Sequence, residues 1–265
     1  MIMPNLIREK LTAGLPTVGT HFLSSDPDIP ELIGDTGFFD YGEFCAEYSA
    51  FDMQLLYHLA RAGQAGGLPL MIKLDQENQG FWAQTAIGAG FKALLFTDIR
   101  TPDDVSSVHR LVRPDNPNGK GLMGVKLRRP ALSRYEPDGY LENLSSIVLS
   151  IMIEKKAAVD NIDEILAVAQ KNQVDMTQWG PADFGFSLGK QELMRLGSVR
   201  PVEELVIRKS IEYGVAPRIE ISDVEEADRY IDLGVRHFCI GWDRFIYRDG
   251  LLRIGEGVRK LVDNL

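Results

Sequence analysis

The stretch "SIVLSIMIEKKAAVDNIDEILAVAQKNQVDMTQWG", residues 146–180, decides the fold. It opens with an apolar run (146–154), continues with apolar residues spaced three and four apart (159–172), and closes with a second short run (174–180). The first run is apolar on both sides, as a parallel strand covered by helices must be. A strand, an amphipathic helix and another strand in this order predict an α/β protein with a parallel sheet.

The same alternation extends along the whole chain. Further strand candidates occupy residues 17–23, 38–45, 68–74, 92–98, 216–221 and 236–243, which makes eight with the two above. No long polar linker and no internal repeat separates them, so residues 1–265 are expected to form a single domain. We predict a (β/α)₈ TIM barrel, with a doubly wound open sheet as the alternative.

Composition narrows the classes of partner. A formal charge of -9 argues against nucleic acid and against anionic membranes, because both attract basic surfaces. No segment approaches the roughly 18 uninterrupted apolar residues of a membrane span, and the first residues do not resemble a signal peptide. Cys45 and Cys239 are the only cysteines and lie in apolar runs, which favours buried free thiols. We therefore expect a cytoplasmic protein that acts on small molecules.

Barrel enzymes carry their chemistry at the carboxyl ends of the strands, so the polar residues that end the apolar runs are the candidates for the site. We interpret two of them, Asp98 and Glu220, as helix caps or surface groups. The candidates are His21, Glu47, Tyr48, Lys73, Asp98, Glu154, Gln178, Asp183, Glu220 and Asp243.

Glu154 and Asp183 form the sharpest pair among these residues. Glu154 ends a strongly apolar run, where a partly dehydrated carboxylate requires a cation, and Asp183 follows one βα unit later. Two carboxylates without a His or Cys pair at zinc spacing favour Mg²⁺ or Mn²⁺. The alternative is structural: Glu154 would pair with Lys155 or Lys156, and Asp183 would cap a turn.

The residues around Asp183 add an anion site. Gly180, Pro181 and Ala182 are small, so backbone N–H groups there can approach a carboxylate, and Gln178 ends the same strand. A metal beside a carboxylate seat indicates a 2-oxo-acid site. There the metal would act as a Lewis acid on the C2 carbonyl and stabilise an enolate.

Residues 113–139 are rich in Pro, Gly and Arg and too long for an ordinary connection. We expect a functional loop over the barrel mouth or a contact between subunits. Arg128 and Arg129 could recognise a distal carboxylate of the substrate, or they could be exposed or contact another subunit.

Two motifs resemble the HpcH/HpaI aldolase/citrate lyase family of metal-dependent pyruvate aldolases: "IEKKAAVDNIDEILAV" (153–168) and "WGPADFGFSLG" (179–189). The likeness covers nearly the whole chain. It implies a barrel whose last helix is exchanged within a dimer, assembled as a hexamer, and a divalent metal (Mg²⁺, Mn²⁺ or Co²⁺) on Glu154 and Asp183. The implied reaction is reversible cleavage of a 4-hydroxy-2-oxo acid to pyruvate or a related 2-oxo acid plus an aldehyde.

The chain departs from the family pattern at the second and third strands. Where the aldolases have Asp-Gly-Glu-His, this chain has Cys45, Ala46, Glu47 and Tyr48, so the usual acid-base histidine is absent. Lys73 replaces an arginine and Met152 a glutamine. The resemblance gives Glu47 a role in ordering metal-bound water. His21 is our first candidate for the replacement base and Tyr48 the second.

Other functions remain open at this point. Lys73 could form a Schiff base with the substrate. The same site could serve a CoA-ester lyase or a 2-oxo-acid decarboxylase. Loss of the histidine also allows a non-catalytic, metabolite-binding barrel. The sequence has no dinucleotide loop, P-loop or Ser/His/Asp pattern, which argues against a dehydrogenase, a kinase or a hydrolase.

Overall fold

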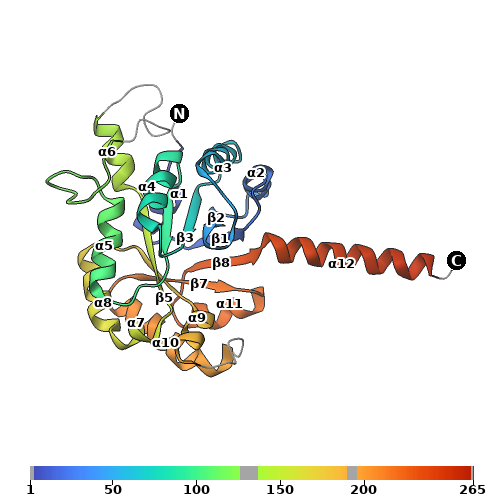
Figure 1. Cartoon of the computed structure of the whole chain (residues 1–265). Coiled ribbons are helices and arrows are strands. Elements are labelled where there is room, and N and C mark those ends of the chain that lie inside the picture. The colour runs from blue at the N-terminus through green and yellow to red at the C-terminus, as the bar shows by residue number, and fades with distance from the viewer. Residues whose placement is uncertain (1–2, 126–136, 190–195, 264) are drawn as a thin grey trace.

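The computed structural model describes residues 3–125, 137–189, 196–263 and 265. Eight parallel strands close into a barrel in sequence order, which confirms the predicted (β/α)₈ fold (Figure 1). Each strand lies within a few residues of its predicted position. The strands are β1 (Thr17–Phe22), β2 (Tyr41–Cys45), β3 (Leu70–Leu74), β4 (Ala93–Phe96), β5 (Val148–Ile153), β6 (Met176–Trp179), β7 (Ala216–Ile221) and β8 (His237–Trp242).

Helices cover the outside of the barrel and shield the apolar outer faces of the strands. The described helices, of which all but α12 lie against the barrel (Figure 1), are α1 (Leu6–Thr12), α2 (Asp28–Asp35), α3 (Met53–Ala65), α4 (Gln79–Ala89), α5 (Pro102–Val112), α6 (Pro137–Ser145), α7 (Lys156–Asp160), α8 (Ile162–Lys171), α9 (Pro181–Ser187), α10 (Leu196–Glu212), α11 (Ala227–Asp232) and α12 (Asp243–Val262). Two short 3₁₀ helices, η1 (Ala46–Tyr48) and η3 (Val224–Glu226), complete the described elements.

The interior of the barrel is apolar at one end and polar at the other. Met71, Leu95 and Met176 fill the lower interior, and Ile7 of α1 packs against the same cluster. Asn5, the N-cap of α1, donates to the backbone carbonyl of Lys92 at 2.9 Å and so fixes this helix to the amino end of the strands. The closed amino end leaves the carboxyl end of the strands as the open mouth.

Helix α12 does not pack on the barrel. It extends away from the body of the molecule beyond β8 (Figure 1), and none of its residues is buried. A helix with apolar residues and no partner along most of its length needs another surface to cover it. Its exposed large apolar side chains are Phe245, Ile246, Tyr247, Leu251, Leu252, Ile254, Val258, Leu261 and Val262.

The described parts of the long segment 113–139 correct one expectation. Its described residues 113–125 follow α5 directly, and α6 leads into β5, so these residues lie at the amino end of the strands and not over the mouth. Arg113 donates to the backbone carbonyl of Ile147, directly before β5, at 3.0 Å. Arg128 and Arg129 lie outside the described residues. No helix in the described part of the chain is long and apolar enough to cross a membrane.

Candidate active site

A cavity of about 250 Å³ opens at the carboxyl ends of the strands. The structure brings together most of the residues that the sequence pointed to: Lys73, Glu154, Gly180, Pro181, Ala182 and Asp183 all line this cavity, with Tyr48 at its side. Glu47 contacts the side chain of Lys73. The strand-end reasoning therefore located the mouth of the barrel correctly.

Glu154 lies at the floor of the cavity, directly after β5, and is only 3% exposed. Its Oε1 accepts a hydrogen bond of 2.8 Å from the backbone N–H of Asp98. Burial raises the pKa of Glu154 to about 7, and the nearby charge of Asp183 adds to the shift. No lysine or arginine pairs with Glu154 among the residues described. The charges of Lys73 and Lys155 and the Asp98 hydrogen bond offset only part of the cost of burying this carboxylate.

The loop at Gly180 is built against this carboxylate. A Cβ atom at position 180 would lie 2.6 Å from Cβ and from Oε2 of Glu154, so only glycine fits between them. Gly180 is the N-cap of α9 and Pro181 its first residue, which places Asp183 in the first helical turn. The motif thus presents Asp183 to the same cavity as Glu154.

Lys155 occupies the space beside Asp183. Its Nζ lies 2.5 Å from Oδ1 of Asp183 and 2.8 Å from Oδ1 of Asp98. The structural alternative, in which Glu154 pairs with Lys155 or Lys156, is therefore not what the described residues show: Lys155 contacts Asp183, and Lys156 contacts Asp160. The interpretation of Asp98 as a cap or surface group is wrong: its backbone holds Glu154 and its side chain holds Lys155.

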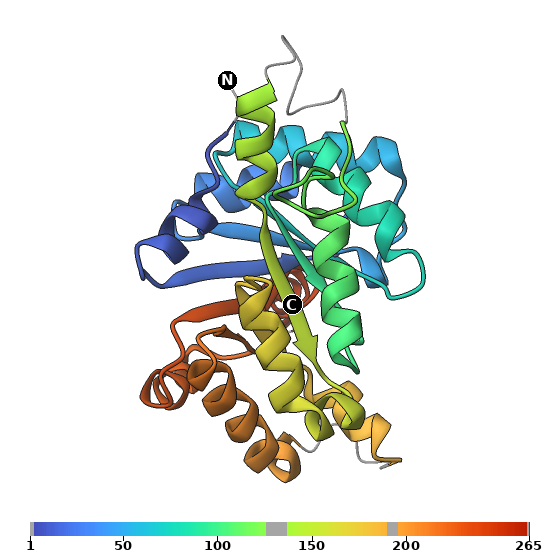
Figure 2. The same cartoon turned by 90° about the vertical axis from the view of Figure 1, so that its left-hand side faces the viewer.

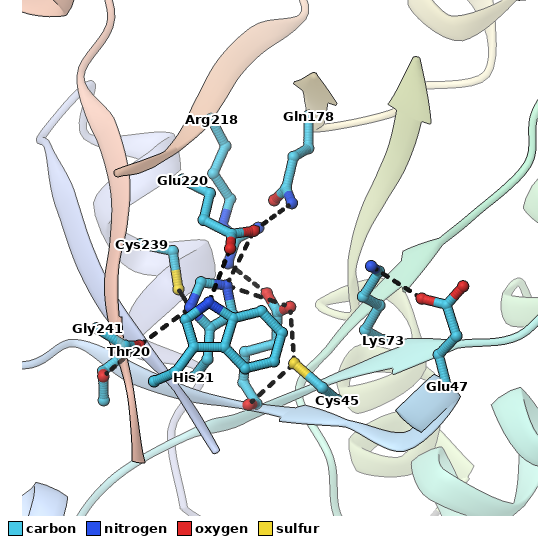
Figure 3. Close-up of polar contacts among 12 residues, drawn as sticks. Thr20, His21, Cys45, Glu47, Lys73, Gln178, Arg218, Glu220, Cys239 and Gly241 are labelled. Carbon is cyan, nitrogen blue, oxygen red and sulfur yellow. Dashed lines mark hydrogen bonds and ion pairs between the residues drawn. The ribbon is translucent and has the colours of Figure 1, made fainter. Parts of the chain in front are cut away.

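Lys73 stands on the opposite wall, at the end of β3. Its Nζ lies 2.8 Å from Oε2 of Glu47 (Figure 3). It also donates to the hydroxyl of Tyr48 at 3.0 Å. Burial alone would lower the pKa of Lys73, but Tyr48 and Glu47 raise it above its ordinary value. The amine is therefore held as a cation, which does not suit a Schiff-base nucleophile.

His21 lies beneath the cavity and does not line it. It is 1% exposed, and the ring of Trp242 stacks on it at 4.6 Å between centroids and 13° between planes. Its Nε2 lies 3.4 Å from Oε2 of Glu220. Burial would lower the pKa of His21, but Cys239, Glu220 and Glu43 raise it well above its ordinary value. The imidazole is held protonated behind Glu220 (Figure 3).

Glu220 is the member of this group that reaches the cavity, so its interpretation as a cap or surface residue is wrong. Trp242 donates from Nε1 to Oε1 of Glu220 at 2.8 Å, and Gln178 donates from Nε2 to Oε2 at 3.4 Å. Burial would raise the pKa of Glu220, but His21 and the Trp242 hydrogen bond outweigh this effect and lower it to about 2. Glu220 is therefore a fixed carboxylate at the wall of the cavity.

A buried ion pair supports this group from inside the barrel. Arg218 and Glu43 are both completely buried, and Nη2 of Arg218 contacts Oε2 of Glu43. Arg218 also donates from Nε to the hydroxyl of Tyr41 at 2.6 Å. The sequence analysis did not identify this ion pair. The signal that could have found it is a charged residue within a mostly apolar strand, Glu43 in β2 and Arg218 in β7. Cys45 and Cys239 are buried free thiols, as predicted.

His21, Glu43 and Cys239 form a second group that could hold a metal, because one ligand atom of each lies within 4.8 Å of the others. The Cys239 sulfur lies 3.5 Å from Nδ1 of His21, whereas Oε1 of Glu43 lies 3.7 Å from Nε2. The thiol and the carboxylate therefore approach different edges of the ring, and Arg218 already compensates Glu43. The unpaired Glu154 beside Asp183 offers the better cation site.

Known proteins agree with this architecture. Among curated sequences, the 2-keto-3-deoxy-L-rhamnonate aldolases of Shigella boydii serotype 4 (strain Sb227) and Escherichia coli O157:H7 are each 26% identical over 252 residues, covering 94% of this chain and 91% of theirs. Among solved structures, a HpcH/HpaI aldolase/citrate lyase family protein from Burkholderia cenocepacia J2315 superposes with a TM-score of 0.85 at 24% identity, covering 97% and 100% of the two chains. The citrate synthase SbnG shares the fold with a TM-score of 0.82 at 22% identity, covering 96% and 98%.

The family model described as HpcH/HpaI aldolase/citrate lyase matches residues 50–249, which include β3 to β8 and every charged group that lines the cavity. The chain therefore belongs to the HpcH/HpaI aldolase/citrate lyase family and is a lyase of the aldolase type.

Proposed function

We propose that this protein is a metal-dependent aldolase that reversibly cleaves a 4-hydroxy-2-oxo acid to pyruvate or a related 2-oxo acid and an aldehyde. Aldolases of the family generally depend on a divalent metal. The observation that carries the proposal is Glu154, a buried carboxylate with a raised pKa and no basic partner among the described residues, facing a cavity that it shares with Asp183. A carboxylate in this position is stabilised by a cation.

The residues present fit a divalent metal of the hard, oxygen-preferring kind. Glu154 and Asp183 offer carboxylate oxygens, and the absence of a Cβ at Gly180 keeps the space beside Glu154 open. The side chain of Asp183 is 42% exposed, so it can turn toward an incoming cation. Lys155 now neutralises Asp183, and a metal there would have to share or displace the lysine. Mg²⁺ and Mn²⁺ suit these ligands best, with Co²⁺ also compatible.

When bound, the metal would supply Lewis acidity, which polarises the keto group of the substrate and stabilises the negative charge that develops on it. The protein's own residues orient the substrate. The Gly180–Ala182 backbone would receive the substrate carboxylate, and Lys73 would place its positive charge against the keto oxygen. Glu47, which contacts Lys73 at 2.8 Å, would hold the lysine and order solvent at the metal.

The acid-base histidine of the related aldolases is replaced by Tyr48 in this chain, so another group has to transfer the proton. Trp242 separates His21 from the cavity, whereas Glu220 faces the cavity and lies 3.4 Å from the ring. We assign proton exchange with the substrate to the carboxylate of Glu220, which would accept a proton from the substrate and return it, while the positive charge of protonated His21 would hold this carboxylate in place. Tyr48 is the second candidate: burial raises the pKa of its hydroxyl, so it stays protonated and can act only as an acid.

Helix α12 is the basis of the homo-oligomer that we propose. Its exposed apolar residues include Phe245, Leu251, Leu252 and Leu261, and it leaves the barrel without an eighth covering helix of its own. Exchange of this helix with a second copy of the chain would cover both surfaces at once. We therefore infer a homodimer as the basic unit, from which a hexamer can be built.

The experiment that tests the activity does not depend on knowing the aldehyde. The protein is incubated with pyruvate in D₂O, and loss of the methyl proton signal is followed by NMR with Mn²⁺, with Mg²⁺ and with a chelator. We expect metal-dependent exchange that is lost in Glu154→Gln and kept in Glu164→Gln, a matched change on the exposed face of α8. Exchange that survives chelation or the Glu154→Gln change would contradict the proposal, as would no exchange with any metal.

A further inference from the structure

A second cavity, which we call the basal cavity, lies at the end of the barrel opposite the mouth. Its volume is about 760 Å³, three times that of the candidate active site, and it falls within the range of small-molecule sites. It is open to solvent on one side and is bordered by α5, the loop after α5, α6 and the end of α8. Figure 2 shows these three helices on the side that faces the viewer.

The charge of the basal cavity is opposite to that of the whole chain. Its lining includes five permanently charged basic residues, Arg8, Arg110, Arg113, Lys120 and Lys171, and no aspartate or glutamate. The chain as a whole has a formal charge of -9. A concave surface of one sign concentrates its field inward and attracts ligands of the opposite charge.

Arg113 is the buried element of this lining. It is 9% exposed, and only one of its nitrogens, Nη1, has a described partner, the carbonyl of Ile147 at 3.0 Å. The nearby carboxylate of Asp175 is already held by Arg8 through two contacts of 2.6 and 2.7 Å. Two guanidinium groups therefore share one carboxylate. An arginine that shares its nearby carboxylate with a second guanidinium keeps charge and N–H donors that an anion in the cavity can use.

The potential around Arg113 is positive enough to affect its neighbours. Burial lowers the pKa of Arg113, Asp175 offsets part of this effect, and Arg8 adds to it. Burial also lowers the pKa of His109, and the charge of Arg113 contributes. The guanidinium remains charged despite the shift, because its ordinary pKa is so high.

The loop that carries Lys120 is fixed in place against Arg113. Gly121 donates to the carbonyl of Pro114 at 2.9 Å, and Met123 donates to that of Arg113 at 3.0 Å. A Cβ at position 121 would lie 1.8 Å from the carbonyl oxygen of Arg113, so glycine is required for this approach. The rim of the cavity is therefore built before any ligand arrives.

Helix dipoles explain only part of this concentration of charge. Arg110 and Lys171 belong to the last turns of α5 and α8, where cations are favourable. Arg113 and Lys120 lie outside helices, and Arg8 comes from α1. Arg110, Lys120 and Lys171 make no ion pair within the described part of the chain, so their charges remain available to a ligand.

We propose that the basal cavity binds a small polyanion, a molecule that carries two or more neighbouring phosphate or carboxylate groups. Arg113 would form the fixed hydrogen-bonding contact, because a guanidinium pairs with such groups in a forked geometry. Arg110, Lys120 and Lys171 would supply the surrounding charge. The ligand would bind outside the mouth, so the inference does not depend on the proposed aldolase activity.

The test is calorimetric titration of the metal-free full chain with inorganic pyrophosphate, and separately with citrate, at low and moderate salt. We expect one site that weakens as salt increases. A tighter affinity for pyrophosphate would identify a phosphate ligand, and a tighter affinity for citrate a carboxylate ligand. Absence of binding of both anions would overturn the inference.

Variants distinguish the basal cavity from general attraction and from the mouth. Lys171→Glu and Arg110→Glu change exposed side chains and should each weaken binding about tenfold or more. Arg208→Glu makes the same charge change on α10, away from the cavity, and should alter affinity less than about twofold. Equal losses in all three would indicate non-specific attraction. Loss in Lys73→Met, with no loss in Lys171→Glu, would place the anion in the active site and refute the inference.

Discussion

Replacing Glu154 by glutamine should stabilise the metal-free protein at alkaline pH. Glutamine keeps the shape of the side chain and an oxygen that can accept the Asp98 N–H, but it removes the buried charge. The pKa of Glu154 is about 7 in the folded protein against an ordinary value of 4.5. Each pKa unit corresponds to about 1.4 kcal/mol, so the charged form costs about 3 kcal/mol of folding free energy.

The sign of the pH dependence follows from the direction of this shift. A carboxyl group whose pKa is raised by folding binds its proton more tightly in the folded state. Its cost is absent below the unfolded pKa of 4.5, grows as the pH rises, and is complete above about 7. Wild-type protein should therefore lose up to about 3 kcal/mol between these values relative to Glu154→Gln, and the two should be equally stable near pH 4.

Urea denaturation followed by tryptophan fluorescence measures this difference, at equal protein concentration and at several pH values. Added Mn²⁺ should stabilise the wild type at pH 8 and leave Glu154→Gln unaffected, because the variant lacks the proposed ligand. Glu164→Gln serves as the control for a surface glutamate. Equal stability of wild type and Glu154→Gln at pH 8, or equal stabilisation of both by Mn²⁺, would refute the reasoning.

Three further outcomes are expected. Lys155→Met should raise the affinity for Mn²⁺ about tenfold in calorimetry, because the ammonium no longer competes for Asp183; an unchanged affinity would show that the lysine does not compete. Arg218→Met should lower the free energy of unfolding in urea by about 3–5 kcal/mol, since it removes the arginine from the buried Glu43 and leaves only the more distant His21, at 3.7 Å, beside that carboxylate. The double change Arg218→Met with Glu43→Leu should recover much of that loss, and no recovery would argue against an isolated pair. A chain that ends before α12 should sediment as a monomer; a dimer without α12 would contradict helix exchange.

The fold was predictable because the same strand–helix pattern recurs many times along the sequence. Eight apolar runs alternate with helical periods, and a closed barrel is the arrangement that gives every strand two neighbours. Glu154 and Asp183 could be placed in one cavity for the same reason, since the ends of neighbouring parallel strands meet at the mouth. The functional roles assigned to these residues remain predictions until the experiments above are done.

The charged residues inside the barrel could not be assigned from the sequence. Glu220 in β7 looked like a surface group, because a charged residue in a strand can point either toward helices and solvent or toward the barrel axis. Only the closed barrel shows that Glu220 of β7 and His21 of β1 are in contact, and that Glu43 and Arg218 form an ion pair in the interior. Such contacts join residues far apart in the sequence: the two hydrogen bonds from β7 to β2 span 177 and 175 positions.

The topology of the barrel, and not the amino-acid composition of the segment, decides where the segment after α5 lies. In a (β/α)₈ barrel, a segment that leaves a strand lies at the mouth, and one that leaves a helix lies at the opposite end. Residues 113–125 leave α5, so their basic side chains cannot line the mouth, however well an arginine-rich loop would suit an anionic substrate. Arg113 and Lys120 instead contribute to the basal cavity. The anion that we propose for this segment would therefore bind at the other end of the barrel from the substrate.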